Sequence, residues 1–325
     1  MKLNLLPKLL FAMLLAFTLN SFVYFSFGNI YSSKILNYSD FSQQFHSGIY
    51  QYRVLSGYFL FWIYDFLSVL QIDYRMFRFK FFEADSEPQM YFSFYILNTF
   101  FMVLSAIILV LISEIKNFIG TNSEKILIVA VSILVMASTQ FVIVPYDISS
   151  YFFLLLFFYF LLKYLEKSSV SMLIVLMILM VISTLNRESS ALSLSLAATL
   201  LYSKFGLKKE MIQPILLLAV TFIAVYFGMR LINETFSTND GNLLLQNFTD
   251  PKNMLGILFW IIFFVFTIFL SKDEKTKRNI LIFHLFSIPY IIMCFYSGII
   301  YEIRLYIPIF LTSLLLGRTE QTRIH

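Results

Sequence analysis

The sequence predicts an all-α integral membrane protein with about ten transmembrane helices, each near the roughly 20 residues that span a bilayer. Two observations support this prediction. Of the 325 residues, 59% are hydrophobic and only 13% are charged, whereas a soluble domain carries about 25% charged residues. Long apolar runs also recur along the whole chain, so we expect one polytopic domain over residues 1–325 and no separate soluble domain.

The apolar runs alternate with short polar segments. The first run follows Lys2 and Lys8, as the apolar core of a signal peptide would. It is long, however, and no small-x-small cleavage site follows it, so we expect an uncleaved transmembrane helix, with a signal peptide as the alternative. The expected helices fall at about 5–28, 91–112, 125–144, 148–164, 170–185, 189–203, 212–231, 254–271, 280–297 and 305–317.

Lys and Arg set the expected orientation, because cytoplasmic loops carry an excess of them. If these runs cross the membrane and the N-terminus is cytoplasmic, most of the 24 basic residues lie in cytoplasmic segments. Acidic residues divide the other way. We therefore expect a multi-pass protein of the inner (plasma) membrane with both termini in the cytoplasm, and the Phe-, Ile- and Lys-rich usage is typical of a bacterial chain. The basic loops are SEIKNFIGTNSEK, KYLEKSS, KFGLKKE and SKDEKTKRN.

Another apolar run, at 54–72, is predicted not to cross. A crossing here would move every later basic loop to the outside, and it would place Asp65 mid-membrane, where a carboxylate costs several kcal/mol. The aromatic residues of this run suit a helix that lies along the lipid headgroups. Residues 29–90 are therefore expected to form one long external loop with one or two interfacial helices, including 54–72.

Compact polar motifs are predicted at the external ends of the helices. An ionisable group there is costly unless it is paired or used, although each motif has a structural alternative as a turn, a helix cap or a headgroup anchor. Several such groups on one face of a bundle predict a shared external cavity. The motifs are Asp40 in NYSDFSQQFH, Tyr52-Arg53, Tyr146-Asp147, Asn186-Arg187-Glu188, and Glu302 with Arg304.

The combination of arginines and carboxylates suggests phosphate chemistry. A guanidinium holds a phosphate bidentately, and a carboxylate can take a proton from an incoming hydroxyl group. Together they could displace a phosphate leaving group from a lipid carrier through an oxocarbenium-like state. The single cysteine, Cys294, allows no intrachain disulfide, and no His or Cys cluster has metal-ligand spacing. Because the basic residues lie in short loops, a nucleic-acid partner is not expected.

The order of these features resembles the glycosyltransferase-C superfamily of integral membrane enzymes. Its members have a cytoplasmic N-terminus, a first helix, and a long first external loop that carries a catalytic acid and interfacial helices. The resemblance covers most of the chain, and it implies that Asp40 is the catalytic base and Asp147 a second acidic catalytic residue. It also implies that Arg187 and Arg304 contact the lipid phosphate. The chain departs from the common pattern because it has no adjacent acidic pair in the first loop and no large soluble C-terminal domain.

The expected function is transfer of a sugar from a polyprenyl-phosphate donor to a cell-surface glycan, lipid or protein acceptor on the non-cytoplasmic face. Tyr52, Arg53, Arg187, Glu188, Glu302 and Arg304 are the predicted substrate-binding residues. The expected partners are the lipid-linked donor and membrane lipid, and no cofactor is expected, although a divalent metal could assist. The alternatives are an O-antigen-type polysaccharide polymerase and a non-enzymatic lipid or solute transporter or envelope-complex scaffold.

Overall fold

The computed structural model describes residues 4–27, 33–77, 83–233, 236–237 and 241–320. Within these residues the secondary structure is helical, apart from one isolated bridge between Phe118 and Thr319. Six of the described helices are long and apolar enough to cross a membrane, or up to seven if one bent pair counts as a single span. The prediction of an all-α chain with several candidate membrane spans is therefore confirmed, while the number of about ten spans stays a prediction.

The helices follow the predicted apolar runs closely. The candidate spans are α1 (Leu5–Ser26), α4 (Pro88–Ser113), α5 (Asn122–Ser138), α6 (Asp147–Glu166), α9 (Lys209–Ile232) and α11 (Pro251–Phe269). The bent pair is α12 (Glu274–Phe286) and α13 (Ile288–Ser297). The shorter helices are α2 (Tyr38–Phe45), α3 (Val54–Val69), α7 (Val170–Asn186), α8 (Ala191–Phe205), α10 (Leu244–Thr249) and α14 (Ile307–Leu316).

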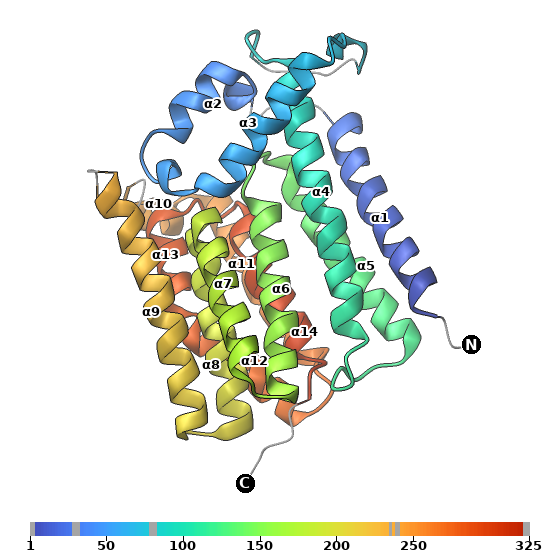
Figure 1. Cartoon of the computed structure of the whole chain (residues 1–325), viewed down its shortest axis with the longest axis vertical. Coiled ribbons are helices and arrows are strands. Elements are labelled where there is room, and N and C mark those ends of the chain that lie inside the picture. The colour runs from blue at the N-terminus through green and yellow to red at the C-terminus, as the bar shows by residue number, and fades with distance from the viewer. Residues whose placement is uncertain (1–3, 28–32, 78–82, 234–235, 238–240, 321–325) are drawn as a thin grey trace.

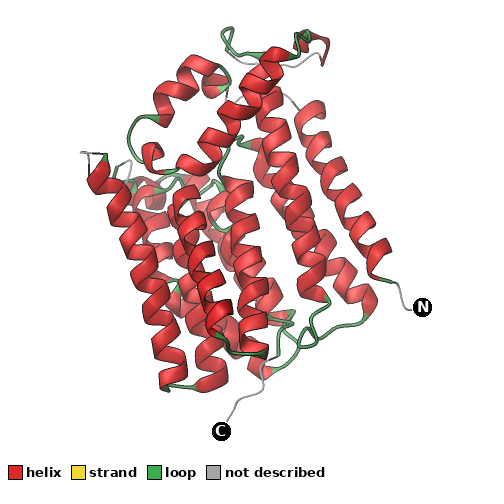
Figure 2. Cartoon of the chain, viewed as in Figure 1, coloured by secondary structure: helices red, strands yellow, loops and turns green. Residues whose placement is uncertain are grey.

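The long helices stand side by side as a bundle, and successive helices run in opposite directions (Figure 1; helices are red in Figure 2). The closest packing joins α4 to α1 and α6, and α7 to α6 and α9. The buried side chains at these contacts are large and apolar, for example Phe94, Met102, Tyr151 and Phe157. Helix α4 is the most enclosed of the candidate spans besides α6, so these two form the centre of the bundle.

Ion pairs tie together one end of the bundle, where α4 ends and α5 begins. The ammonium of Lys8 on α1 lies 2.8 Å from the carboxylate of Glu114, which Lys125 also approaches at 3.7 Å. Arg318, after α14, pairs with Glu124 at 2.8 Å. We call this end the lysine end. The segments that were predicted to be cytoplasmic meet here, and α1 is an integral part of the bundle.

The opposite end, where α6 begins and α7 ends, is covered by α2 and α3 (Figure 1). We call it the arginine end. The run at 54–72 forms a helix only over Val54–Val69, and that helix packs obliquely against α4 and α7. It leaves an exposed stripe of Tyr58, Trp62 and Phe66. Gly57 allows the ring of Phe45 on α2 to lie against α3, because a Cβ there would collide with that ring.

The bend between α12 and α13 was not predicted, since residues 280–297 read as one apolar run. The two helices meet at 51° around Ser287. Pro289 lies in the first turn of α13, and a proline has no amide hydrogen to continue a helix and clashes with the preceding turn. The bend directs α13 toward the arginine end, where its residues line the cavity described next.

Candidate functional site

A cavity of about 550 Å³ opens at the arginine end. Its walls come from the start of α3, the turn between α7 and α8, α9, α13 and the segment that precedes α14. One wall is polar and the other is apolar. The polar wall includes Tyr50, Arg53, Tyr146, Arg187, Glu188, Glu302 and Arg304, and the apolar wall includes Phe222, Pro289, Met293, Ile299 and Leu305.

Asp147 lies behind the polar wall and holds two of its arginines. Its carboxylate is fully buried, with a side-chain exposure of 0%. One oxygen contacts Arg187, and the other lies 3.1 Å from Arg304. Asp147 is the first residue of α6, a position where the helix dipole favours negative charge. Since Asp147 does not line the cavity, its geometry suits positioning of the two guanidinium groups.

Glu188 forms a second pair of contacts with arginines. Its Oε2 accepts a hydrogen bond from Nε of Arg53 at 3.0 Å, and its Oε1 lies 3.6 Å from Nη2 of Arg230. Arg230 is almost completely buried, and its guanidinium stacks on the rings of Tyr52 at 4.3 Å and Tyr226 at 3.6 Å. Such cation–π contacts are strongest when water is excluded. Glu188 therefore has one partner in the cavity wall and one behind it.

Glu302 and Arg304 complete the polar wall. The guanidinium of Arg304 lies 2.6 Å from Glu302 while it also contacts Asp147. The Asp147 and Glu302 clusters share Arg304, and together with the Glu188 cluster the whole group contains four arginines and three carboxylates. The excess of one positive charge at the edge of a cavity favours an anionic ligand.

The charges near Glu188 keep it ionised. Burial alone would raise the pKa of Glu188, but the neighbouring Arg53, together with Arg187 and Arg230, holds its pKa below the usual value of 4.5. Burial opposes the charge of Arg53 as well, and Glu188 more than offsets it, so the pKa of Arg53 is raised. Both members of the pair are therefore charged at neutral pH.

A buried hydrogen-bond cluster connects α3, α6 and α7 next to the polar wall. Ser56 on α3 donates to the side-chain oxygen of Asn186 on α7 at 2.5 Å, and Ser149 on α6 donates to the same oxygen at 3.0 Å. All three side chains are completely buried. Each lies within three residues of a charged member of the site, so the cluster fixes Arg53, Asp147 and Arg187 relative to one another.

The segment that carries Glu302 and Arg304 is held by side chains that satisfy its backbone. Asn247 donates to the carbonyl oxygens of Phe295 and Gly298 at 2.8 and 2.7 Å. The hydroxyl groups of Tyr151 and Tyr290 donate to the carbonyl oxygens of Arg304 and Leu305 at 3.0 and 2.9 Å. Irregular backbone inside a bundle requires such partners, and here they fix the position of the Glu302–Arg304 pair.

Of the predicted site residues, five line the cavity: Arg53, Arg187, Glu188, Glu302 and Arg304. Two others stand behind it, Asp147 beneath Arg187 and Arg304, and Tyr52 beneath Arg230. The structure therefore brings residues from the ends of separate helices to one cavity.

Asp40 lies elsewhere. It is exposed in the first turn of α2, and its carboxylate accepts a hydrogen bond from the side chain of Asn37 at 2.8 Å. Gln44, one turn further along α2, does line the cavity, whereas Asp40 does not. A catalytic role for Asp40 stays a prediction, and in this conformation its carboxylate serves the N-terminal cap of α2.

Arg230 was not among the predicted site residues. Arg230 lies at the predicted external end of the apolar run 212–231. That position could have been used to group Arg230 with Arg187 and Arg304, which also lie at predicted external helix ends. The aromatic partners Tyr50, Tyr226 and Tyr290 carry no such signal, since tyrosine is abundant throughout this chain. Only the fold distinguishes the tyrosines that line the cavity.

No group of three or more His, Cys, Asp or Glu side chains in the described part of the chain is placed to hold a metal ion. Cys294 is a free, buried thiol on the cavity wall. Comparisons with protein-family models, curated proteins and solved structures give no match to this chain.

Proposed function

We propose that this protein is a membrane glycosyltransferase that moves a sugar from a polyprenyl-phosphate donor to a cell-surface glycan, lipid or protein acceptor on the non-cytoplasmic face. The observation that supports this most is the polar wall of the cavity, where Arg53, Arg187 and Arg304 stand beside Glu188 and Glu302. The arginines would bind a phosphate, and a carboxylate beside them would accept a proton.

The proposal includes a membrane topology of ten crossings, made by α1, α4 to α9, α11, the α12–α13 pair and α14. The shorter members of this set lie within the same bundle as the candidate spans (Figure 1). In this topology the arginine end faces away from the cytoplasm, because the basic loops gather at the lysine end. Helices α2 and α3 then lie along the outer headgroups, and their exposed aromatic side chains suit that depth.

The two walls of the cavity match the two parts of a lipid phosphate. The polar wall offers guanidinium groups, which bind phosphate oxygens bidentately. The apolar wall comes from α9, α13 and the segment that follows α13, and Met293 on this wall is 42% exposed. In the proposed topology the exposed surface of Met293 meets lipid, so an isoprenoid tail could leave the cavity there while its phosphate stays with the arginines.

Glu302 is the best-placed base in this arrangement. Asp147 is enclosed by Arg187 and Arg304 and does not line the cavity, and Asp40 is outside it. Among the described residues, Glu188 has two arginine partners, whereas Glu302 has one, Arg304, which it shares with Asp147. The carboxylate of Glu302 is therefore the less neutralised of the two in the cavity.

In the proposed reaction, a hydroxyl oxygen of the acceptor forms a bond to the anomeric carbon while the bond from that carbon to the phosphate oxygen breaks. The electron pair stays on the phosphate, where the arginines stabilise the added negative charge. The hydroxyl proton passes to Glu302. The products are the glycosylated acceptor and polyprenyl phosphate.

The structure offers one specific observation in favour of a transporter. Helices α12 and α13 form a broken span beside the cavity, and discontinuous helices often form the substrate sites of transporters. A lipid-phosphate transporter would use the same arginines without a base. The two candidates therefore differ in their dependence on Glu302.

The test is sugar transfer by the purified full chain in nanodiscs, with radiolabelled polyprenyl-phosphate sugars and glycan extracted from a strain that lacks the gene. We expect label to enter the glycan with the wild type and not with Glu302→Gln, which keeps the side-chain size. Release of polyprenyl phosphate without label in the glycan, or full transfer by Glu302→Gln, would contradict the proposed reaction. Short, uncapped repeats in the deletion strain would favour the polymerase alternative.

A further inference from the structure

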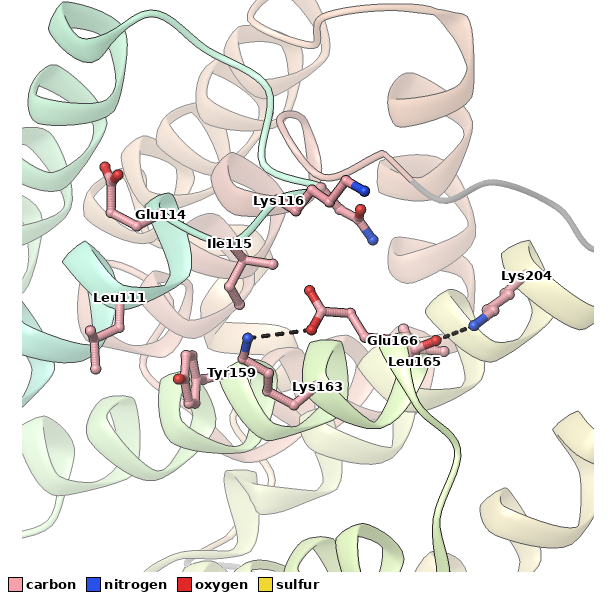
Figure 3. A pocket seen from close by; sticks show the side chains of 10 residues that line it. Leu111, Glu114, Ile115, Lys116, Tyr159, Lys163, Leu165, Glu166 and Lys204 are labelled. Atoms are coloured by element: carbon pink, nitrogen blue, oxygen red, sulfur yellow. Dashed lines mark hydrogen bonds and ion pairs between the residues drawn. The ribbon is translucent and has the colours of Figure 1, made fainter. Parts of the chain in front are cut away.

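A second pocket, of about 790 Å³, lies at the lysine end of the bundle. It is formed where α4, α6 and α8 end, and it is lined by Lys116, Lys163 and Lys204 (Figure 3). Helix α6 connects the two sites, since it begins at Asp147 and ends at Glu166. Its 20 residues span about 30 Å at roughly 1.5 Å per residue, so this pocket is separate from the arginine cavity.

The positive charges in this pocket exceed the carboxylates that face them. Lys163 pairs with Glu166 at 3.3 Å. The other carboxylate that lines the pocket, Glu114, is engaged by Lys8 and Lys125, neither of which lines the pocket. Over the part of the chain that the structure describes, no carboxylate lies within ion-pair distance of Lys116 or Lys204.

Helix capping explains only part of this arrangement. Lys204 donates to the carbonyl oxygen of Leu165 in the last turn of α6, as basic side chains commonly do at helix C-termini. Lys116 follows the end of α4, is exposed, and is one of the residues that line the pocket (Figure 3). Capping of α6 by Lys204 does not explain why Lys116 and Lys163 line the same pocket as Lys204.

The pocket also extends into the apolar part of the bundle. Tyr159 lies seven residues before Glu166 on α6 and lines the pocket together with Leu111, which corresponds to a depth of about 10 Å along the helix. The lining thus combines ammonium groups with apolar and aromatic side chains, and the ammonium of Lys163 lies 5.8 Å from the ring of Tyr159. A phospholipid likewise places its phosphate next to the start of its chains at a membrane surface.

We propose that this pocket binds the phosphate headgroup of an anionic phospholipid in the cytoplasmic leaflet. Basic pockets between transmembrane helices on the cytoplasmic side are suited to such headgroups. The proposal does not depend on glycosyltransferase activity, because it uses different residues at the other end of the bundle. Free inorganic phosphate is the other source of the same chemistry, and the experiment below separates the two.

The experiment measures lipid binding to the full chain in detergent micelles by native mass spectrometry, with phosphatidylglycerol and phosphatidylcholine as probes. We expect preferential binding of phosphatidylglycerol. The combined change Lys116→Gln, Lys163→Gln and Lys204→Gln should weaken it by on the order of a hundredfold, since each lysine near a membrane surface contributes about fivefold. The matched control is Lys208→Gln, Lys209→Gln and Lys275→Gln, which removes the same charge from exposed residues of the same end.

Equal loss in the control variant, or no loss in the pocket variant, would overturn the proposal. Displacement of phosphatidylglycerol by millimolar inorganic phosphate would overturn the assignment to a lipid headgroup and favour a soluble phosphate ligand. If the triple variant fails to fold, the single change Lys116→Gln at an exposed position provides the same test. It should weaken phosphatidylglycerol binding about fivefold and leave phosphatidylcholine binding unchanged.

Discussion

The burial of Asp147 makes a sharp prediction about stability. Its carboxylate has no exposed surface and neutralises Arg187 while it also contacts Arg304. The change Asp147→Asn keeps the shape of the side chain but removes its charge. Arg304 retains Glu302 as a partner at 2.6 Å, whereas Arg187 has no other carboxylate within ion-pair distance among the described residues.

The expected cost follows from the stranded charge. Removing one partner of a buried ion pair destabilises a protein by about 3–5 kcal/mol. The lower end applies here because only one arginine is left unpaired, so we expect a loss of about 3 kcal/mol, or roughly a hundredfold in the ratio of folded to unfolded protein. Adding Arg187→Gln removes the stranded charge, and the double variant should recover part of the loss, with a coupling of about 0.5–3 kcal/mol.

The assay is reversible unfolding of the purified protein in mixed micelles, followed by circular dichroism, for the wild type, both single variants and the double variant. Lys163→Gln serves as the control, because its pair with Glu166 is partly exposed and such pairs contribute at most about 1 kcal/mol. An Asp147→Asn variant as stable as this control, or losses that simply add in the double variant, would show that Asp147 does not hold Arg187.

Three further predictions follow from the same geometry. The stability difference between the wild type and Glu188→Gln should be complete above pH 4.5 and shrink as the pH falls through the lowered pKa of Glu188; a difference that grows in acid would refute this. Arg304→Lys keeps the charge but loses the planar fork, so titration of polyprenyl phosphate should show about tenfold weaker binding, and unchanged affinity would make Arg304 a structural anchor only. Transfer assays should show activity lost in Glu302→Gln and kept in Asp40→Asn, and the reverse result would assign the base to α2.

Much of the fold is predictable because membrane helices must satisfy their backbone internally. Apolar runs therefore indicate helices directly, and α1, α4, α9 and α11 lie where those runs predict them. The kink before α13 was missed, because Pro289 lies within a continuous apolar run and hydropathy does not register its missing amide hydrogen.

For the site, the end of the bundle that carries the charged residues could be predicted. Parity of the helices placed Arg53, Arg187 and Arg304 on one side, and the structure brings them to one cavity. The degree to which each side chain is buried in the protein could not be predicted. Asp147 and Asp40 were both predicted as acidic residues on the external side, yet one is completely buried under two arginines and the other is exposed on α2. That difference depends on tertiary packing between segments far apart in the chain.

The arginine cavity is proposed to recognise the phosphate of a lipid. The most direct measurement compares binding of undecaprenyl phosphate with binding of undecaprenol, which has the same tail and no phosphate, to the full chain in nanodiscs. The protein should carry the Lys116→Gln, Lys163→Gln and Lys204→Gln changes, so that the lysine end does not contribute. We expect undecaprenyl phosphate to bind at least roughly tenfold more tightly than undecaprenol, since each charge-assisted hydrogen bond contributes about 1.5–3 kcal/mol. Equal affinity for the two lipids would contradict it.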